Sequence, residues 1–384
     1  MKTLLLFSFD MSLTEWVRLG LYNREMGLYR NLANEYDVDV DLLTYGMEDD
    51  CSFETNKRIT VIPSYAGRRR PTSVWIRLFA SFLLPIRLAD EFKSADLYKS
   101  NQMSGSWVGV VAKILYRKPF LLRCGYELSE ALKLEKARMW KRFLAWVLSF
   151  VCYHFATQIL VPTDDIKNRI NKKFLIKKAK INVHPNSVDT RVFSASPDEI
   201  QRKRGILFVG RLTYQKNIFL LLDAVLDLDV DVTIVGAGEL LEDVKDRINA
   251  GRNNVTLLRD IPNDELATIY KESLIYVLCS RYEGNPKSLI EAMACGCAVV
   301  GTAVPGIKNM ISHEKTGVLV TEDENALRQA ILRLLQSREI CTTLGRAARE
   351  LVVEKFSLSQ SSARERDIYE TLVSTNQKTL NGHV

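Results

Sequence analysis

Residues 280–306 place two acidic residues around the start of a helix; they read S-R-Y-E-G-N-P-K-S-L-I-E-A-M-A-C-G-C-A-V-V-G-T-A-V-P-G. Pro286 suits the first turn of a helix, because its missing N–H costs little there. Gly296 is a natural end for the same helix. Glu283 then lies in the loop before the helix, and Glu291 lies about one and a half turns into it.

This arrangement suits a ligand that carries phosphate and sugar side by side. The start of a helix presents free N–H groups and the positive end of the helix dipole, which favour phosphate. Carboxylates such as those of Glu283 and Glu291 accept hydrogen bonds from sugar hydroxyls. The stretch therefore indicates a nucleotide-sugar ligand.

The same residues resemble a known family. The pattern E-G-N-P-K-S-L-I-E-A-M-A-C-G is similar to the E-x7-E signature of the family-4 retaining glycosyltransferases (group 1), which have the GT-B fold. V-G-R-L-T-Y-Q-K-N (209–217) resembles the segment whose Arg and Lys hold the donor diphosphate, and H-P-N-S-V-D-T-R-V-F (184–193) resembles the approach to the interdomain linker. T-G-V-L-V (316–320) and a closing F-S-L-S…I-Y-E-T-L (356–372) complete the series. The resemblance covers nearly the whole chain and is specific from about residue 180 onward.

The resemblance implies a hexosyltransferase-type enzyme. It would move a sugar from a nucleoside-diphosphate sugar to a saccharide or lipid-linked acceptor, in the assembly of cell-surface polysaccharide, lipopolysaccharide or glycolipid. Retention implies an α-linked product from an α-linked donor, by a front-face route in which the departing phosphate oxygen takes the acceptor proton. Neither a metal nor another cofactor is expected, because fixed cations are available for the diphosphate.

The chemistry is assigned to Glu283, Arg211 and Lys216. Arg211 and Lys216 follow the apolar run I-L-F-V-G and would stabilise the charge that develops on the leaving diphosphate. The resemblance gives Glu283 contacts to the donor sugar and Glu291 contacts to the ribose. The full predicted donor set is Gly210, Arg211, Lys216, Ile261, Glu283, Gly284, Asn285, Pro286, Lys287, Ser288, Leu289 and Glu291.

The acceptor side is predicted on the N-terminal half. Family members carry a Gly-Gly-rich loop after the first strand, whereas this chain reads F-D-M-S-L-T-E-W-V-R-L-G (9–20), so Ser12 and Gly20 are the candidates to replace it. Arg123 and Glu127 follow a predicted strand and are candidates for contact with donor sugar or acceptor. The alternative for these two residues is a structural ion pair.

Short apolar runs alternate with amphipathic stretches from end to end, which predicts an α/β protein with parallel sheets. Seven such runs before residue 190 and six after it are expected to be strands. The predicted architecture is GT-B: two doubly wound Rossmann-like domains facing across a cleft at the carboxyl ends of their strands. They span 1–193 (acceptor) and 204–358 (donor), and the resemblance implies that a helix from about 360 to 384 packs back on the first.

The net charge of +7 is unevenly distributed. Residues 1–190 hold 29 Lys and Arg against 20 Asp and Glu. No nucleic-acid-binding module is recognisable, so nucleic acid is not an expected partner. Residues 68–93 mix cations with Trp and Phe, which fits either an interfacial helix pair on an anionic membrane or a helix with one core face and a solvated basic rim. The expected location is cytoplasmic, with peripheral attachment to the inner face of the cell membrane as an option.

Residues 143–156 are almost entirely apolar. About 20 residues are needed to span a bilayer, so this stretch predicts a buried helix and no transmembrane segment is expected. The seven cysteines show no C-x-x-C spacing and are expected to be reduced core thiols. The apolar N-terminus is expected to be a first strand rather than a signal sequence.

Parts of the sequence also fit functions other than sugar transfer. The turn V-G-A-G-E (235–239) suggests a nicotinamide-dependent Rossmann enzyme, but the third glycine of that fingerprint is absent. The same fold also serves sugar-nucleotide epimerases and glycoside phosphorylases, and a non-catalytic sugar-nucleotide-binding protein is a further alternative. Two D-x-D-x-D runs (37–41 and 227–231) suggest a metal, although their carboxylates are expected to face solvent at strand entries.

Overall fold

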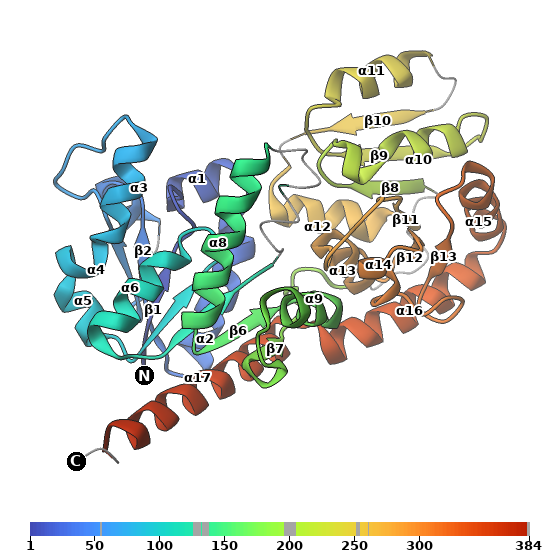
Figure 1. Ribbon diagram of the computed structural model, residues 1–384. Helices are drawn as coiled ribbons and strands as arrows, with labels where there is room; N and C mark the ends of the chain where they lie inside the picture. The colour runs from blue at the N-terminus through green and yellow to red at the C-terminus, as the bar shows by residue number, and fades with distance from the viewer. Residues whose placement is uncertain are drawn as a thin grey trace. The chain divides into compact units, whose positions relative to one another are not determined.

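The computed structural model describes residues 1–53, 56–125, 132, 138–195, 205–250, 254–259 and 261–381 (Figure 1). The chain divides into two compact units. The first consists of Met1–Pro185 and Ser361–Val384, and the second of Asn186–Gln360. Each unit is a parallel sheet covered by helices on both faces, which is the α/β class that the alternating sequence pattern predicts.

The first unit contains a seven-stranded sheet in the order β3-β2-β1-β4-β5-β6-β7. All of its strand pairs are parallel. The strands are β1 (Lys2–Leu6), β2 (Asp39–Thr44), β3 (Ile59–Pro63), β4 (Leu97–Ser100), β5 (Phe120–Arg123), β6 (Gln158–Val161) and β7 (Ile181–Val183).

The helices of this unit divide between the two faces of the sheet. Right-handed crossovers put the helices that connect β1 to β2 on one face and those that connect β3 through β7 on the other. The first group is α1 (Leu13–Arg18) and α2 (Tyr22–Glu35). The second group is α3 (Val74–Phe82), α4 (Leu84–Arg87), α5 (Ala89–Ser94), α6 (Ser106–Tyr116), α8 (Met139–Phe155) and α9 (Asp164–Phe174).

The second unit contains a six-stranded sheet in the order β10-β9-β8-β11-β12-β13. Its strands are β8 (Gly205–Val209), β9 (Asp231–Val235), β10 (Val255–Leu258), β11 (Ile275–Leu278), β12 (Ala298–Thr302) and β13 (Val318–Val320). One apolar cluster packs α10 (Ile218–Ala224), α11 (Leu241–Ala250) and α15 (Glu324–Gln336) on one face. The other packs α12 (Asn263–Glu272), α13 (Lys287–Ala294) and α14 (Pro305–Lys308), and α16 (Arg338–Lys355) contributes to both.

All thirteen predicted strands form, because runs of Leu, Ile and Val bounded by polar turns are a strong signal for buried parallel strands. The first strand ends at Leu6, although the mostly apolar run of the sequence continues to Phe9. The chain turns there: Met11 N–H donates to Ser8 O, and Asp10 adopts a left-handed φ of 68°.

Two details of burial differ from expectation. Asp41 does not face solvent; it is 2% exposed and its carboxylate lies 2.8 Å from the ammonium of Lys2. Residues 143–156 do form most of α8, but that helix is not buried: Phe143 is 64% exposed and Leu144 is 55% exposed. None of the helices among the described residues is both long enough and apolar enough to cross a bilayer.

The C-terminal helix α17 (Leu358–Asn381) brings a carboxylate into the first unit. Glu365 is 1% exposed and forms an ion pair with Lys99 of β4, which is 0% exposed. Tyr369 Oη donates to Glu365 Oε1 at 2.6 Å, and His184 Nε2 lies 3.7 Å from Glu365 Oε2. Although burial opposes ionisation, Lys99 and His184 lower the pKa of Glu365 to about 2.

Candidate active site

Two loops leave the second sheet at the point where its strand order reverses. β8 and β11 are neighbours, but the chain proceeds from β8 towards β9 on one side and from β11 towards β12 on the other. Open parallel sheets bind ligands outside the carboxyl ends of strands at such a point. The loops that begin there, 210–217 and 279–286, contain Arg211, Lys216 and Glu283.

Hydrogen bonds hold these two loops against each other. Arg281 N–H donates to Gln215 O at 2.9 Å, and Gln215 Nε2 donates to Tyr282 O at 2.9 Å. The guanidinium of Arg281 donates to Tyr214 O at 2.9 Å and lies 4.2 Å from the Tyr214 ring centroid. The loops therefore form one platform, although 67 residues separate the bonded positions.

Lys216 and Glu283 meet on this platform. Lys216 Nζ donates to Glu283 Oε1 at 2.5 Å, and Ser280 Oγ donates to the same oxygen at 2.8 Å. The two charged side chains are 13% and 7% exposed. The pair brings together a cation and a carboxylate that the sequence predicts for the diphosphate and the sugar.

Arg211 takes a different position from Lys216. Its side chain is exposed and makes no ion pair with any residue in the described part of the chain. It directly follows Gly210, where an added Cβ would lie 3.5 Å from Lys216 Cε. The loop thus presents one cation that is already paired and one that is open to an incoming anion.

Helix α13 carries the second acid. It begins at Lys287 with Pro286 as its N-cap, one position earlier than the expected place in the first turn. Glu291 is 4% exposed, as its apolar neighbours predicted, and Tyr270 Oη donates to its Oε2 at 3.2 Å. The helix ends at Ala294 and Gly296 has φ 72°, which agrees with the predicted glycine stop.

Both acids influence one buried tyrosine. Tyr276 Oη is within 2.8 Å of Ser288 Oγ in the first turn of α13. Burial raises the pKa of Tyr276 well above its ordinary value, and the charges of Glu291 and Glu283 raise it further. Glu283 and Glu291 are therefore near the same core residue, although only Glu283 pairs with Lys216.

Neighbouring backbone supports the loop of Glu283 from behind. An added Cβ on Gly306 would lie 2.4 Å from the carbonyl oxygens of both Glu283 and Gly284, so only glycine fits there. Asn285 Oδ1 accepts from Asn186 N at 2.6 Å, and Asn285 O accepts from Asn186 Nδ2 at 2.7 Å. The loop is consequently fixed at both its backbone and its side chains.

The glycines of V-G-A-G-E have a packing role. An added Cβ on Gly236 would lie 2.0 Å from Gly210 O, and one on Gly238 would lie 2.3 Å from Leu212 O. Leu212 N donates to Ala237 O at 2.9 Å. These glycines let the turn after β9 pack directly on the loop that carries Arg211, which explains G-x-G without a nicotinamide cofactor.

The remaining predicted donor residues lie around the same edge. Ile261 precedes α12 and packs against the apolar cluster of that face. Lys287 and Ser288 form the start of α13. Leu289 is fully buried in the core, so its side chain is closed to a ligand.

Three of the predicted acceptor residues, Ser12, Gly20 and Arg123, belong to different elements of the first unit. Ser12 is the N-cap of α1 and accepts from Glu15 N at 3.1 Å, while Gly20 lies in the turn after α1 with φ 66° and open space around it. Arg123 lies at the end of β5, where burial opposes its charge but Glu25 and other acidic neighbours raise its pKa. Glu127 lies outside the described residues.

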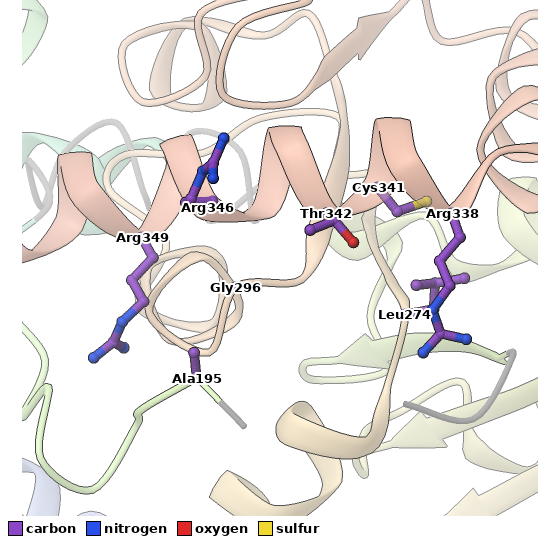
Figure 2. A pocket seen from close by; sticks show the side chains of 8 residues that line it. All are labelled: Ala195, Leu274, Gly296, Arg338, Cys341, Thr342, Arg346 and Arg349. Atoms are coloured by element: carbon purple, nitrogen blue, oxygen red, sulfur yellow. The ribbon is translucent and has the colours of Figure 1, made fainter. Parts of the chain in front are cut away.

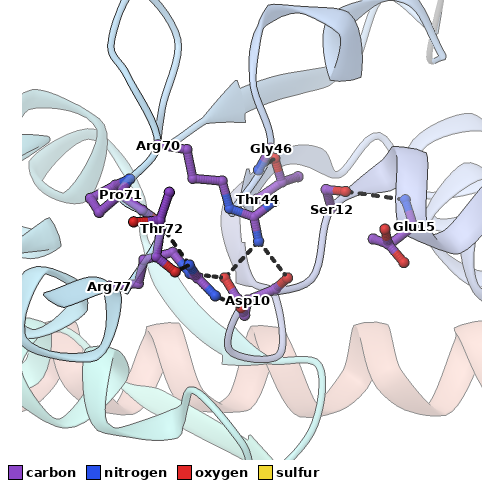
Figure 3. Close-up of polar contacts among 9 residues, drawn as sticks. All are labelled: Asp10, Ser12, Glu15, Thr44, Gly46, Arg70, Pro71, Thr72 and Arg77. Atoms are coloured by element: carbon purple, nitrogen blue, oxygen red, sulfur yellow. Dashed lines mark hydrogen bonds and ion pairs between the residues drawn. The ribbon is translucent and has the colours of Figure 1, made fainter. Parts of the chain in front are cut away.

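A charge cluster that sequence reasoning missed lies in the loop after β1 (Figure 3). Asp10 Oδ1 accepts from Arg70 Nη2 at 2.6 Å and from Arg77 Nε at 2.8 Å, and Arg77 Nη2 donates to Asp10 Oδ2 at 2.7 Å. Despite partial burial, these guanidinium groups lower the pKa of Asp10. Asp10 thus anchors the loop at the place where the family has its glycines, and 60 or more residues separate it from its partners.

A hollow elsewhere in the second unit contains none of the predicted residues (Figure 2). It lies between α16 and the turn after α13, and its lining residues are Ala195, Leu274, Gly296, Arg338, Cys341, Thr342, Arg346 and Arg349. Arg349 Nη1 donates to the carbonyls of Phe193 and Ala294, so it satisfies the end of α13. This arginine has a structural role.

Sequence comparison identifies two adjoining regions. Residues 26–192 match the model described as Glycosyltransferase Family 4, and residues 189–351 match Glycosyl transferases group 1. Alpha-maltose-1-phosphate synthase of Mycolicibacterium smegmatis is 25% identical over 321 residues, 74% of this chain and 81% of that protein. The UDP-Gal:alpha-D-GlcNAc-diphosphoundecaprenol alpha-1,3-galactosyltransferase of Escherichia coli is 27% identical over 241 residues, 56% of this chain and 61% of that protein.

Solved structures share the fold across the whole chain. Sucrose-phosphate synthase of Thermosynechococcus elongatus superimposes with a TM-score of 0.79 at 20% identity, covering 98% of this chain and 100% of that one. HepE of Anabaena in complex with UDP-glucose gives a TM-score of 0.72 at 18% identity, covering 100% of both chains. At these identities the likeness establishes the fold.

Proposed function

Because the chain is a group 1 glycosyltransferase of the GT-B fold, we propose that it is a retaining, metal-independent enzyme of family 4 that uses the platform of Lys216 and Glu283. The observation that carries the proposal is the contact between Lys216 and Glu283 at the strand-order reversal, beside the exposed Arg211. The same two loops hold two cations that suit a diphosphate and a carboxylate that suits a sugar.

The proposed roles follow from the contacts. Arg211 is the cation that first meets the donor diphosphate, because its guanidinium is exposed and suits bidentate binding of phosphate oxygens. Lys216 has three N–H donors, so it can keep its hydrogen bond to Glu283 while it donates another to a phosphate oxygen. Both cations then stabilise the charge that grows on the leaving diphosphate, so no metal is needed in this scheme.

Glu283 and Glu291 are proposed to bind different parts of the donor. Glu283 is oriented by Lys216 and Ser280, which leaves its carboxylate able to accept from a sugar hydroxyl beside the reacting carbon. Glu291 is proposed to accept from the ribose, since it is buried in the second turn of α13 behind Ser288. The start of the same helix favours the diphosphate.

The relatives suggest which substrates to test first. HepE binds UDP-glucose, and the E. coli relative uses UDP-galactose with an acceptor on diphosphoundecaprenol. We therefore propose a UDP-hexose donor and a saccharide or lipid-linked acceptor in cell-surface polysaccharide assembly. The same proposal places the enzyme in the cytoplasm, attached peripherally to the inner face of the membrane.

The test combines a donor screen with product analysis. Thermal-shift measurements with uridine, guanosine and adenosine diphosphate sugars identify the donor, and mass spectrometry with NMR then follows transfer and anomeric configuration in the presence of EDTA. We expect an α-linked product with the wild type and a loss of transfer with Glu283→Gln, while the exposed control Glu354→Gln stays active. Donor isomerisation, phosphorolysis or binding without turnover would each contradict the proposal.

A further inference from the structure

Helix α8 shows the reverse of the usual burial pattern. Its buried residues are Ala145, Ser149, Cys152 and Tyr153, and the first three of these are small. Large apolar residues point the other way: Trp140 is 50% exposed and Phe143 is 64% exposed. A surface helix in water normally places its polar residues on that side. The outward side of α8 is therefore built to meet something apolar.

Two other helices that contact α6, α3 and α4, share this property. Phe79 of α3 is 70% exposed, Trp75 of α3 is 63% exposed and Ile86 of α4 is 60% exposed. α3, α4 and α8 all contact α6, and they lie with it on one face of the seven-stranded sheet (Figure 1). The apolar face of these helices consists of Trp75, Ile76, Phe79, Leu83, Ile86, Ile114, Leu115, Met139, Trp140, Phe143, Leu144, Val147 and Val151.

Basic residues predominate around the apolar face, although two of them, Arg70 and Arg77, are paired with Asp10. The segments 68–88, 106–118 and 138–155 contain eleven Lys and Arg and no Asp or Glu. Arg68, Arg69, Arg117 and Lys141 are exposed. Basic residues near an anionic membrane are attracted to its surface charge. A surface with apolar aromatic residues and a basic rim is thus complementary to an anionic lipid bilayer rather than to water.

We propose that the apolar face docks the first unit onto an anionic lipid bilayer, with Trp75 and Trp140 inserted to the boundary between headgroups and acyl chains. This surface would be the one through which the peripheral attachment of the proposed function takes place. The proposal rests on that function only for the reason why the protein would be at a membrane. Interfacial helices bury their apolar side by roughly 5–10 Å, and basic residues then reach the phosphates. No helix needs to cross the bilayer for this mode of binding.

Vesicle co-sedimentation of the full chain tests the proposal. The vesicles are phosphatidylcholine alone or phosphatidylcholine with phosphatidylglycerol, each at low and high salt. We expect binding to the anionic vesicles that weakens as salt rises, and at least tenfold weaker binding for the double variant Trp140→Gln/Phe143→Gln. Val353→Gln, an exposed apolar position on α16 in the second unit, is the matched control and should bind as the wild type does.

Tryptophan fluorescence locates the contact. Trp16 and Trp107 are buried, at 2% and 6% exposure, whereas Trp75 and Trp140 are exposed. Brominated acyl chains should quench the wild type, and Trp75→Phe and Trp140→Phe should each remove part of that quenching. Circular dichroism and thermal unfolding of every variant separate loss of binding from loss of folding.

Two results would overturn the proposal. One is the absence of binding to any vesicle by a folded wild type. The other is a concentration-dependent dimer, seen by light scattering, that the Trp140→Gln/Phe143→Gln variant abolishes while vesicle binding is unaffected; the face would then be an interface between copies. Glu283→Gln should still bind vesicles, so the vesicle experiment tests the proposal even if the proposed catalytic role of Glu283 is wrong.

Discussion

Lys216 and Glu283 form an ion pair with each other. The pair is mostly buried, at 13% and 7% exposure, and Ser280 adds a hydrogen bond to the carboxylate. Breaking a buried pair by removing one partner leaves an uncompensated charge. The proposed catalytic geometry and the local stability of the platform thus depend on the same two side chains.

Replacing Lys216 by methionine is expected to lower kcat on the order of 10²-fold or more, because one group that stabilises the developing charge is lost. The donor KM should rise as well, since Lys216 also binds the ground-state diphosphate in the proposed scheme. Lys245→Met is the control, because the exposed ammonium of Lys245 pairs with Glu242 on α11. Steady-state kinetics compare kcat and KM of the two variants. Wild-type kcat in Lys216→Met would remove Lys216 from the mechanism.

Replacing Glu291 by glutamine should act on binding rather than on the chemical step. Hydrogen bonds to charged groups contribute about 1.5–3 kcal/mol, so the donor KM should rise on the order of 10- to 100-fold. The value of kcat should change little, because the proposed ribose contact would be present in both ground and transition states. Saturation kinetics separate the two constants; a large fall in kcat at unchanged KM would assign Glu291 a different role.

The sequence could predict Lys216 and Glu283 because each lies in a local pattern after an apolar strand. It could not predict that Asp10 pairs with Arg70 and Arg77. These arginines follow Asp10 by 60 and 67 residues, and no motif links them to it. The one local signal was an Asp at the end of a strand where the family has glycine. Asp tolerates the left-handed conformation that Asp10 adopts, with φ 68°.

At the scale of elements, the platform depends on close backbone contact between loops. The turn after β9 packs on the loop after β8, with room for no side chain at Gly236. The glycine therefore determines where Arg211 is held, although Gly236 itself is in a different loop. Loops fixed in this way would hold the proposed donor contacts in a defined geometry.

Gly236→Ala is expected to weaken donor binding at least tenfold, because its Cβ would lie 2.0 Å from Gly210 O and the Arg211 loop must move. Gly205→Ala in β8 is the control, since its nearest neighbour would be 3.4 Å away. Isothermal titration with the donor diphosphate measures the difference. Equal affinities in the two variants would show that the loop contact does not position Arg211.

Helix α8 shows where sequence patterns fail at this scale. Its apolar residues occur on all sides, so the periodicity predicts a helix without saying which side is buried. The almost entirely apolar segment 143–156 is therefore predicted from the sequence to be a buried helix. The structure instead packs the small residues Ala145 and Ser149 inward, and only contacts with β5 and α6 could reveal that choice.

At the scale of the whole molecule, the first unit is completed by residues from both ends of the chain. Glu365 of α17 neutralises Lys99 in the interior of the unit, and Tyr369 and His184 surround the same carboxylate. Without α17, Lys99 would be a buried cation without this counter-charge. The sequence marked the C-terminal segment only by resemblance, because no local pattern links Lys99 to a glutamate 266 residues away.

Glu365→Gln is expected to destabilise the full chain by about 3–5 kcal/mol, the usual cost of removing one partner from a buried ion pair. Combining it with Lys99→Met should recover most of that loss, since no unpaired buried charge then remains. Glu370→Gln, an exposed partner of Arg366 on the same helix, should change stability by about 0.5 kcal/mol or less. Urea unfolding measures the stability of all three variants. If Glu365→Gln alone were as stable as Glu370→Gln, the assigned role of the pair would be wrong.

The same cluster predicts a loss of stability in acid. The pKa of Glu365 falls from an ordinary 4.5 to about 2, so its contribution is complete above 4.5 and is lost as pH falls towards 2. Burial also lowers the pKa of His184, although Glu365 opposes this, so the unfolded chain takes up that proton first as pH falls below 6.5. The free energy of unfolding should therefore decrease from pH 7 towards pH 2. A pH-independent value across this range would be inconsistent with both groups.

The division of the first unit between residues 1–185 and 361–384 has a consequence for biosynthesis. A ribosome delivers all seven strands of that sheet early, but the counter-charge for Lys99 emerges only after the second unit has been made. Domains in most multidomain chains fold from the N-terminus during translation. Here the second unit should reach its native state first, and the earlier-made half should stay open to chaperones until the last helix arrives.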